Sequence, residues 1–141
     1  MRYVLLMRLP LLLAALLVSG ACDNGDTPTN PTDPPTETET FAGTVVRNGS
    51  QIHSFVASAA GTVRATLTGV SPAGSPALGF SMGTWDGTVC TAVLTNNAAT
   101  TTSVLTGTVV GISSLCIRVF DSSGEIPADA PVNYTVTVER P

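Results

Sequence analysis

From residue 41 onward, apolar and polar residues alternate in short runs separated by Gly, Pro, Asn, Asp and Ser. The alternation is clearest at 63–67, 115–119 and 134–138, where every second residue is Val, Ala, Leu, Ile or Tyr. A period of two residues is typical of strands that bury one face. The pattern predicts eight strands, at roughly 42–47, 51–57, 61–69, 76–82, 88–95, 100–109, 114–120 and 132–139. Short strands about 12 residues apart predict an all-β fold, a single antiparallel β-sandwich of jelly-roll type, over residues 41–141.

The first 21 residues follow a different pattern. Arg2 and Arg8 precede an apolar run that ends at Val18, and three small residues follow it. These are the three regions of a secretory signal peptide. The apolar run is about 10 residues long, whereas a membrane-spanning helix needs about 20. We therefore expect residues 1–21 to be a signal peptide that is removed on export.

Val18-Ser19-Gly20-Ala21-Cys22 resembles the lipobox of bacterial lipoproteins, although that family usually has Leu where this chain has Ser19. The resemblance implies that Cys22 becomes the first residue of the mature chain and carries a lipid. The expected location is then the cell envelope, with the protein lipid-anchored to a membrane and facing the periplasm or the exterior. Ser19 and Ala21 also suit an ordinary signal peptidase, which would leave a soluble secreted protein.

The segment between the anchor and the domain has a composition of its own. Residues 23–40 contain six Thr, five acidic residues and four Pro, and Pro is their only apolar side chain. Such a segment cannot build a core. We expect residues 22–40 to form a lipidated, disordered tether.

Charge and composition exclude several functions. All six basic residues of the 141 are Arg, and the net charge is −4. The lack of Lys excludes phosphate-binding lysine loops and Schiff-base chemistry, and the net negative charge argues against a nucleic-acid partner. The chain has one His, which excludes a metal site built from several histidines. We expect no cofactor, with calcium as the one alternative considered below.

The cysteines predict a disulfide. Cys90 and Cys116 lie in two predicted strands, and neither belongs to a C-x-x-C motif. In an oxidising compartment these two can pair, which leaves Cys22 for the lipid. We expect a structural disulfide between them.

The sequence contains one catalytic motif, but the motif lacks the surrounding elements that catalysis would need. Residues 79–83, Gly-Phe-Ser-Met-Gly, match the G-x-S-x-G pattern of hydrolases. That pattern needs a strand, a turn and a helix, with the His after the Ser in the chain, but His53 precedes Ser81. We expect Ser81 to lie in an ordinary strand and the protein not to be an enzyme.

Two groups of residues are candidate ligand sites. Trp85 and Asp86 lie near the end of a predicted hairpin, where an exposed ring could stack on a sugar or anchor a protein. The alternative is a tight turn with Trp85 folded over the end of the sandwich. Asp121, Glu125 and Asp129 could place oxygens around calcium, although Asp and Ser are also common in loops without an ion.

Part of the domain resembles the bacterial pre-peptidase C-terminal domain. The resemblance is carried by residues 52–57, 60–67, 114–121 and 132–138. It departs from the family at Ser114, Leu115 and Cys116, where the family has a Gly and an aromatic residue. The resemblance implies a β-sandwich that serves as an accessory module of secreted hydrolases.

Two hypotheses for function remain open. The first is a non-catalytic binding module that recognises a surface polysaccharide or a protein through the loops around Trp85. The second is a structural or accessory subunit of an envelope complex, which would use a sheet face or edge.

Overall fold

The computed structural model describes residues 35–141, and these form eight strands without a helix. The strands are β1 (Glu37–Val45), β2 (Ser50–Ala57), β3 (Gly61–Ser71), β4 (Leu78–Trp85), β5 (Cys90–Ala99), β6 (Val104–Val109), β7 (Ser113–Phe120) and β8 (Val132–Arg140). The expected signal peptide, Cys22 and most of the expected tether lie outside the described residues. Within the described part of the chain, there is no apolar helix long enough to cross a bilayer.

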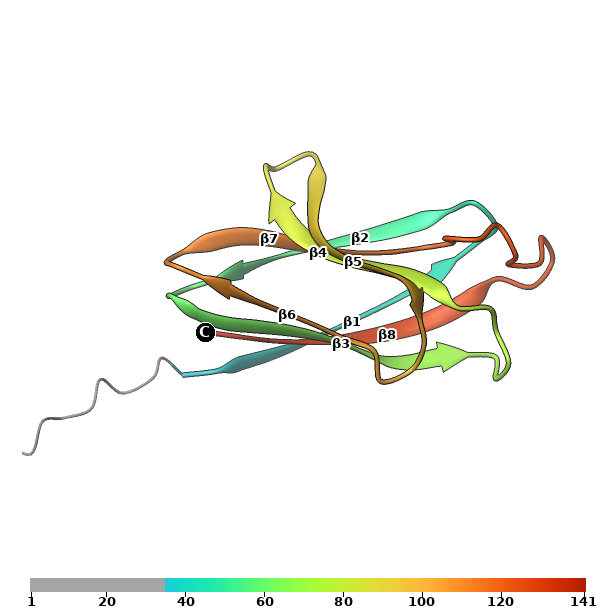
Figure 1. Ribbon diagram of the computed structural model, residues 1–141, viewed down its shortest axis with the longest axis horizontal. Helices are drawn as coiled ribbons and strands as arrows, with labels where there is room; N and C mark the ends of the chain where they lie inside the picture. Colours follow the sequence, from blue (N-terminus) through green and yellow to red (C-terminus); the bar gives the residue numbers. More distant parts are fainter. Residues whose placement is uncertain (1–34) are drawn as a thin grey trace, which may run out of the picture. The chain divides into compact units, whose positions relative to one another are not determined.

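The strands form two antiparallel sheets of four strands each, and Figure 1 shows these sheets as two stacked layers. One sheet has the order β1-β8-β3-β6 and the other β2-β7-β4-β5. Successive strands along the chain alternate between the sheets, except that β4 and β5 form a hairpin. This order is that of a jelly roll. The predicted all-β sandwich is confirmed.

The core between the sheets includes the inward positions that the alternation predicted. At these positions the exposed fraction of the side chain is 9% or less. They include Val63, Ala65, Leu67, Leu78, Phe80, Met82, Leu115, Ile117, Val119, Tyr134, Val136 and Val138. The outward positions between them in β3 and β8 are Thr and Arg, which remain at least partly exposed, whereas outward Ser81 of β4 and Cys116 of β7 are covered. One-sided burial therefore explains why the period of two is so regular in this sequence.

The first strand begins earlier than its composition suggests. β1 starts at Glu37, whereas we expected the tether to continue to residue 40. Glu37 and Glu39 lie opposite the end of β8, and the Arg140 guanidinium forms ion pairs with both carboxylates. These carboxylates, together with backbone pairing, hold in the sheet a segment that lacks apolar residues.

The predicted strand at 100–109 begins later, at Val104. Residues 100–103 instead form a turn in which the Ser103 N–H donates to the Thr100 carbonyl over 3.0 Å. The Thr102 N–H in turn donates to the carbonyl of Leu67 over 2.7 Å. These two hydrogen bonds satisfy backbone groups that, in a continuous strand, would need partners in a neighbouring strand.

The two lateral sides of the sandwich differ. At the side formed by β1 and β2, the Phe41 and His53 rings stack with their centroids 5.0 Å apart. His53 Nε2 also forms a 2.7 Å hydrogen bond with the Tyr134 hydroxyl of the facing sheet. These contacts close that side. The opposite side, formed by β5 and β6, contains a groove.

Candidate functional site

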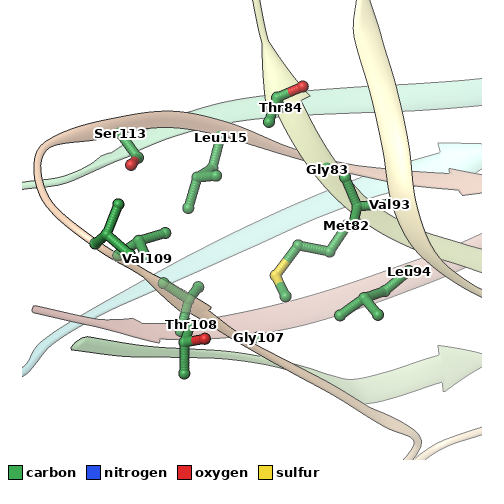
Figure 2. Close-up of a pocket in the computed structure, with 12 residues that line it drawn as sticks. Met82, Gly83, Thr84, Val93, Leu94, Gly107, Thr108, Val109, Ser113 and Leu115 are labelled. Carbon is green, nitrogen blue, oxygen red and sulfur yellow. The ribbon is translucent and has the colours of Figure 1, made fainter. Parts of the chain in front are cut away.

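The groove opens between β6 of one sheet and the β4–β5 hairpin of the other, and Figure 2 shows the side chains that line it. Its volume is about 350 Å³. Pockets of this size and larger are the usual sites of ligand binding in proteins. The lining residues are Val63, Met82, Gly83, Thr84, Val93, Leu94, Gly107, Thr108, Val109, Val110, Ser113 and Leu115.

The groove is open because the hairpin bends away from the facing sheet. Figure 1 shows the end of the β4–β5 hairpin rising out of its layer. The register of β4 with β5 shifts between Met82 and Gly83, which marks a bulge at the bend. At this point the chain needs glycine, because a Cβ at Gly83 would collide with the carbonyl oxygen of Thr91.

The disulfide holds the bent hairpin in place. Cys90 of β5 is bonded to Cys116 of β7, as predicted, although β4 lies between these strands in the sheet. Two strand spacings amount to about 9.6 Å. The Cα atoms of the two cysteines are only 5.8 Å apart. The start of β5 therefore folds back over the outer face of β4, away from the facing sheet.

The groove carries no formal charge. None of its twelve lining residues is ionisable, and its polar side chains are the hydroxyls of Thr84, Thr108 and Ser113. Large aliphatic side chains lie exposed around it: Val93 is 70% exposed and Val110 is 100% exposed. Ile112, in the turn that follows β6, is 81% exposed. An apolar pocket whose neighbourhood is also apolar is suited to an uncharged, apolar ligand group.

The predicted site at Trp85 and Asp86 lies beside this groove. Trp85 is the last residue of β4, lies opposite Cys90 and is half-buried. The Asp86 carboxylate accepts hydrogen bonds from the N–H groups of Val89 (2.6 Å) and Thr88 (2.8 Å). These two N–H groups hold the pKa of Asp86 below its ordinary value. Asp86 thus shapes the turn, and ligand binding at Trp85 stays a prediction.

The predicted calcium residues lie in the loop between β7 and β8. The Asp121 carboxylate accepts hydrogen bonds from the N–H groups of Asn48 and Gly124, both over 2.9 Å. Among residues 35–141, no three His, Cys, Asp or Glu side chains gather in a way that could hold a metal ion. Asp121 therefore organises its loop in the structure, and calcium binding with Glu125 and Asp129 stays a prediction.

Ser81 and His53 lie on opposite faces of one sheet. Ser81 is paired with Arg118 on the outward face and is only 2% exposed. His53 is paired with Ile117 on the inward face, where partial burial lowers its pKa. The sheet itself separates these two side chains, so they cannot act on each other.

The groove was not foreseen from the sequence. The alternation predicted Met82 as a core residue and gave no sign that its side chain borders an opening. One signal was available: Val110 and Ile112 flank Gly111 in a turn, where two large aliphatic residues are unusual.

Comparisons with known proteins do not assign the chain to a family. No family model matches the chain, so the resemblance to the pre-peptidase C-terminal domain stays a prediction. No curated protein matches the chain either. One solved structure that it resembles comes from work described as "Bacillus endospore appendages form a novel family of disulfide-linked pili". That chain is 16% identical in sequence, and the match covers 75% of this chain and 86% of the other with a TM-score of 0.36.

Proposed function

We propose that this protein is a non-catalytic interaction module of the bacterial cell envelope, attached to a membrane by a lipid on Cys22. Its binding site is the groove between β6 and the β4–β5 hairpin. The observation that carries the proposal is an uncharged, apolar groove of about 350 Å³ beside a bent hairpin that a disulfide ties to β7. The disulfide also supports a location outside the reducing cytoplasm.

The lining of the groove favours a protein partner over a polysaccharide. Sugars are recognised through many hydrogen bonds, and the groove offers the hydroxyls of Thr84, Thr108 and Ser113 beside aliphatic side chains. Aliphatic and aromatic side chains of a protein would instead be buried there at a gain of about 25 cal/mol per Å². A protein partner also accommodates the second hypothesis, in which the domain is an accessory subunit of an envelope complex.

The positions of the titratable residues support the non-catalytic part of the proposal. Ser81 is buried on one face of its sheet, and His53 is hydrogen-bonded to Tyr134 on the other. The groove itself is lined by no general acid, general base or activated nucleophile.

Site-specific photo-crosslinking in the host cell tests the proposal. A photoreactive amino acid at Val93, beside the groove, should yield a crosslink to a defined protein. The same group at Thr40, on the outer face of the other sheet, is the matched control and should yield no such product. The proposal is wrong if Val93 gives no adduct, or the same adducts as Thr40.

A parallel assay covers the polysaccharide alternative. The purified, oxidised protein is passed over immobilised cell-wall polysaccharide, beside a Trp85→Ala variant. Retention that depends on Trp85 would place the binding site at the hairpin end and would overturn the groove assignment. Absence of retention, together with the Val93 crosslink, supports the protein-binding module.

A further inference from the structure

Two strand glycines of this domain are each covered by an aromatic ring from the neighbouring strand. Gly43 of β1 lies opposite Tyr134 of β8, and a Cβ on Gly43 would lie 2.8 Å from the Cζ atom of that ring. Gly79 of β4 lies opposite Phe120 of β7, and a Cβ there would collide with the ring. The missing side chain leaves room for the ring to lie flat on the backbone, an arrangement that stabilises glycine in a strand.

Gly107 of β6 is a third strand glycine, and no aromatic ring of the described residues covers it. It faces inward opposite Val63 of β3, and no other strand within residues 35–141 pairs with β6. A Cβ on Gly107 would meet only the ends of two flexible side chains, Met82 Cε at 3.4 Å and Leu94 Cδ1 at 3.6 Å. The space above Gly107 is part of the groove.

The free edge of β6 also lacks the features that usually prevent strand pairing. Charged residues, proline and bulges protect most edge strands. β6 has the sequence VLTGTV and pairs with β3 in an unbroken register. By contrast, the edge strand β1 carries Glu37 and Glu39, and β5 is interrupted by two register shifts. The remaining edge strand, β2, contains no glycine, so it has no position at which a missing side chain leaves space for a ring.

We propose that β6 accepts an extended segment of a partner protein as a ninth strand, with a large aromatic side chain opposite Gly107. This inference rests on the proposed function, because it uses the same groove. Backbone hydrogen bonds to the open edge would supply affinity, and alternate side chains entering the groove would supply specificity. The uncharged edge and the uncharged groove together require a segment without charged residues at its inward positions.

Synthetic peptides and the full protein test this inference directly. The probe is a capped, fluorescently labelled peptide, Thr-Val-Thr-Phe-Thr-Val-Thr, and the comparison peptide has Ala in place of Phe. We expect the Phe peptide to bind about tenfold more tightly or better, because burying a phenyl ring rather than a methyl group is worth 1.4 kcal/mol or more. Hydrogen exchange should show that bound peptide protects the backbone amides of β6.

Two protein variants test whether the preference for Phe depends on the space above Gly107, which we call the slot. Gly107→Leu fills the slot with the protein's own side chain and should abolish the preference for Phe. Thr106→Leu puts the same side chain on the outer face of the same strand and should preserve it. Thermal unfolding of both variants shows whether each is folded, and Gly107→Ala, which adds only one methyl group, replaces Gly107→Leu if that variant is not.

The outcomes separate this inference from the proposed function. Equal affinity for the Phe and Ala peptides, or a preference for Phe that survives in Gly107→Leu, would overturn strand addition at β6. A crosslink from Val93 would still support the groove as a binding site. Concentration-dependent dimerisation that Gly107→Leu abolishes would show that the strand comes from a second copy, and would overturn the assignment to a different partner.

Discussion

Removing the disulfide should destabilise the domain strongly, because the bond fixes the start of β5, a strand with few buried side chains. The perturbation is the double variant Cys90→Ala and Cys116→Ala. The two residues are separated by 26 positions in the chain. In the loop-entropy description, closing a loop of that size contributes about 3.5 kcal/mol to the free energy of unfolding. Apart from the buried Ala99 at its end, β5 is exposed or half-exposed along its length, so packing offers little compensation.

The assay is unfolding in guanidinium chloride and by heat, with oxidised parent and variant at the same concentration. A loss of about 3.5 kcal/mol corresponds to a fall in Tm of roughly 15–25 °C for a domain of this size. Ser114→Ala, an exposed residue of β7 two positions before Cys116 and on the same face, is the control and should change Tm little. If the double variant unfolds within about 1 kcal/mol of the parent, the hairpin is held by something other than the bond, and the reasoning fails.

Three further perturbations test the fold. Burial lowers the pKa of His53 below its ordinary value of 6.5, so the unfolded chain binds the proton more tightly than the folded chain does. The free energy of unfolding should therefore fall as the pH drops below 6.5, and His53→Gln should flatten that dependence in thermal melts. Gly79→Ala should cost about 1–3 kcal/mol in denaturant unfolding, because the Phe120 ring must move, and an unchanged midpoint would contradict the ring-on-glycine packing. Ile126, fully buried in the loop between β7 and β8, should cost about 2–4 kcal/mol when changed to Ala, and a smaller loss would mean that this loop is not anchored by it.

The strands were most predictable where only one face is buried, as in β3 and β8. Where the alternation is regular, as at Val63, Leu67 and Val136, the predicted inward residues are the buried ones. The start of β1 was missed because Glu37 and Glu39 bind Arg140, about a hundred residues away in the chain. No local pattern can indicate a pairing over that separation.

The site was less predictable than the fold, for a physical reason. Trp85 stood out because it is the one Trp of the chain, yet the structure places it half-buried at the end of β4. The groove exists because no strand in the described part of the chain pairs with the free edge of β6 at Gly107 and because the β4–β5 hairpin bends at Gly83. A glycine that makes room for a ring and a glycine that leaves an open slot look the same in sequence. Only the strand pairing distinguishes them, because it places Tyr134 opposite Gly43 but Val63, which has no ring, opposite Gly107.

The bent hairpin is difficult to explain by stability alone. If the start of β5 lay flat in its sheet, its aliphatic residues could cover β6, and Val93 would be less exposed than its 70%. Instead the chain leaves apolar surface in water there and secures the bend with the bond from Cys90 to Cys116. Proteins break the rules of burial mainly at functional sites, where stability is supplied from elsewhere. The covalent bond therefore maintains an apolar opening that burial would otherwise tend to close, and that opening is what the proposed interaction site requires.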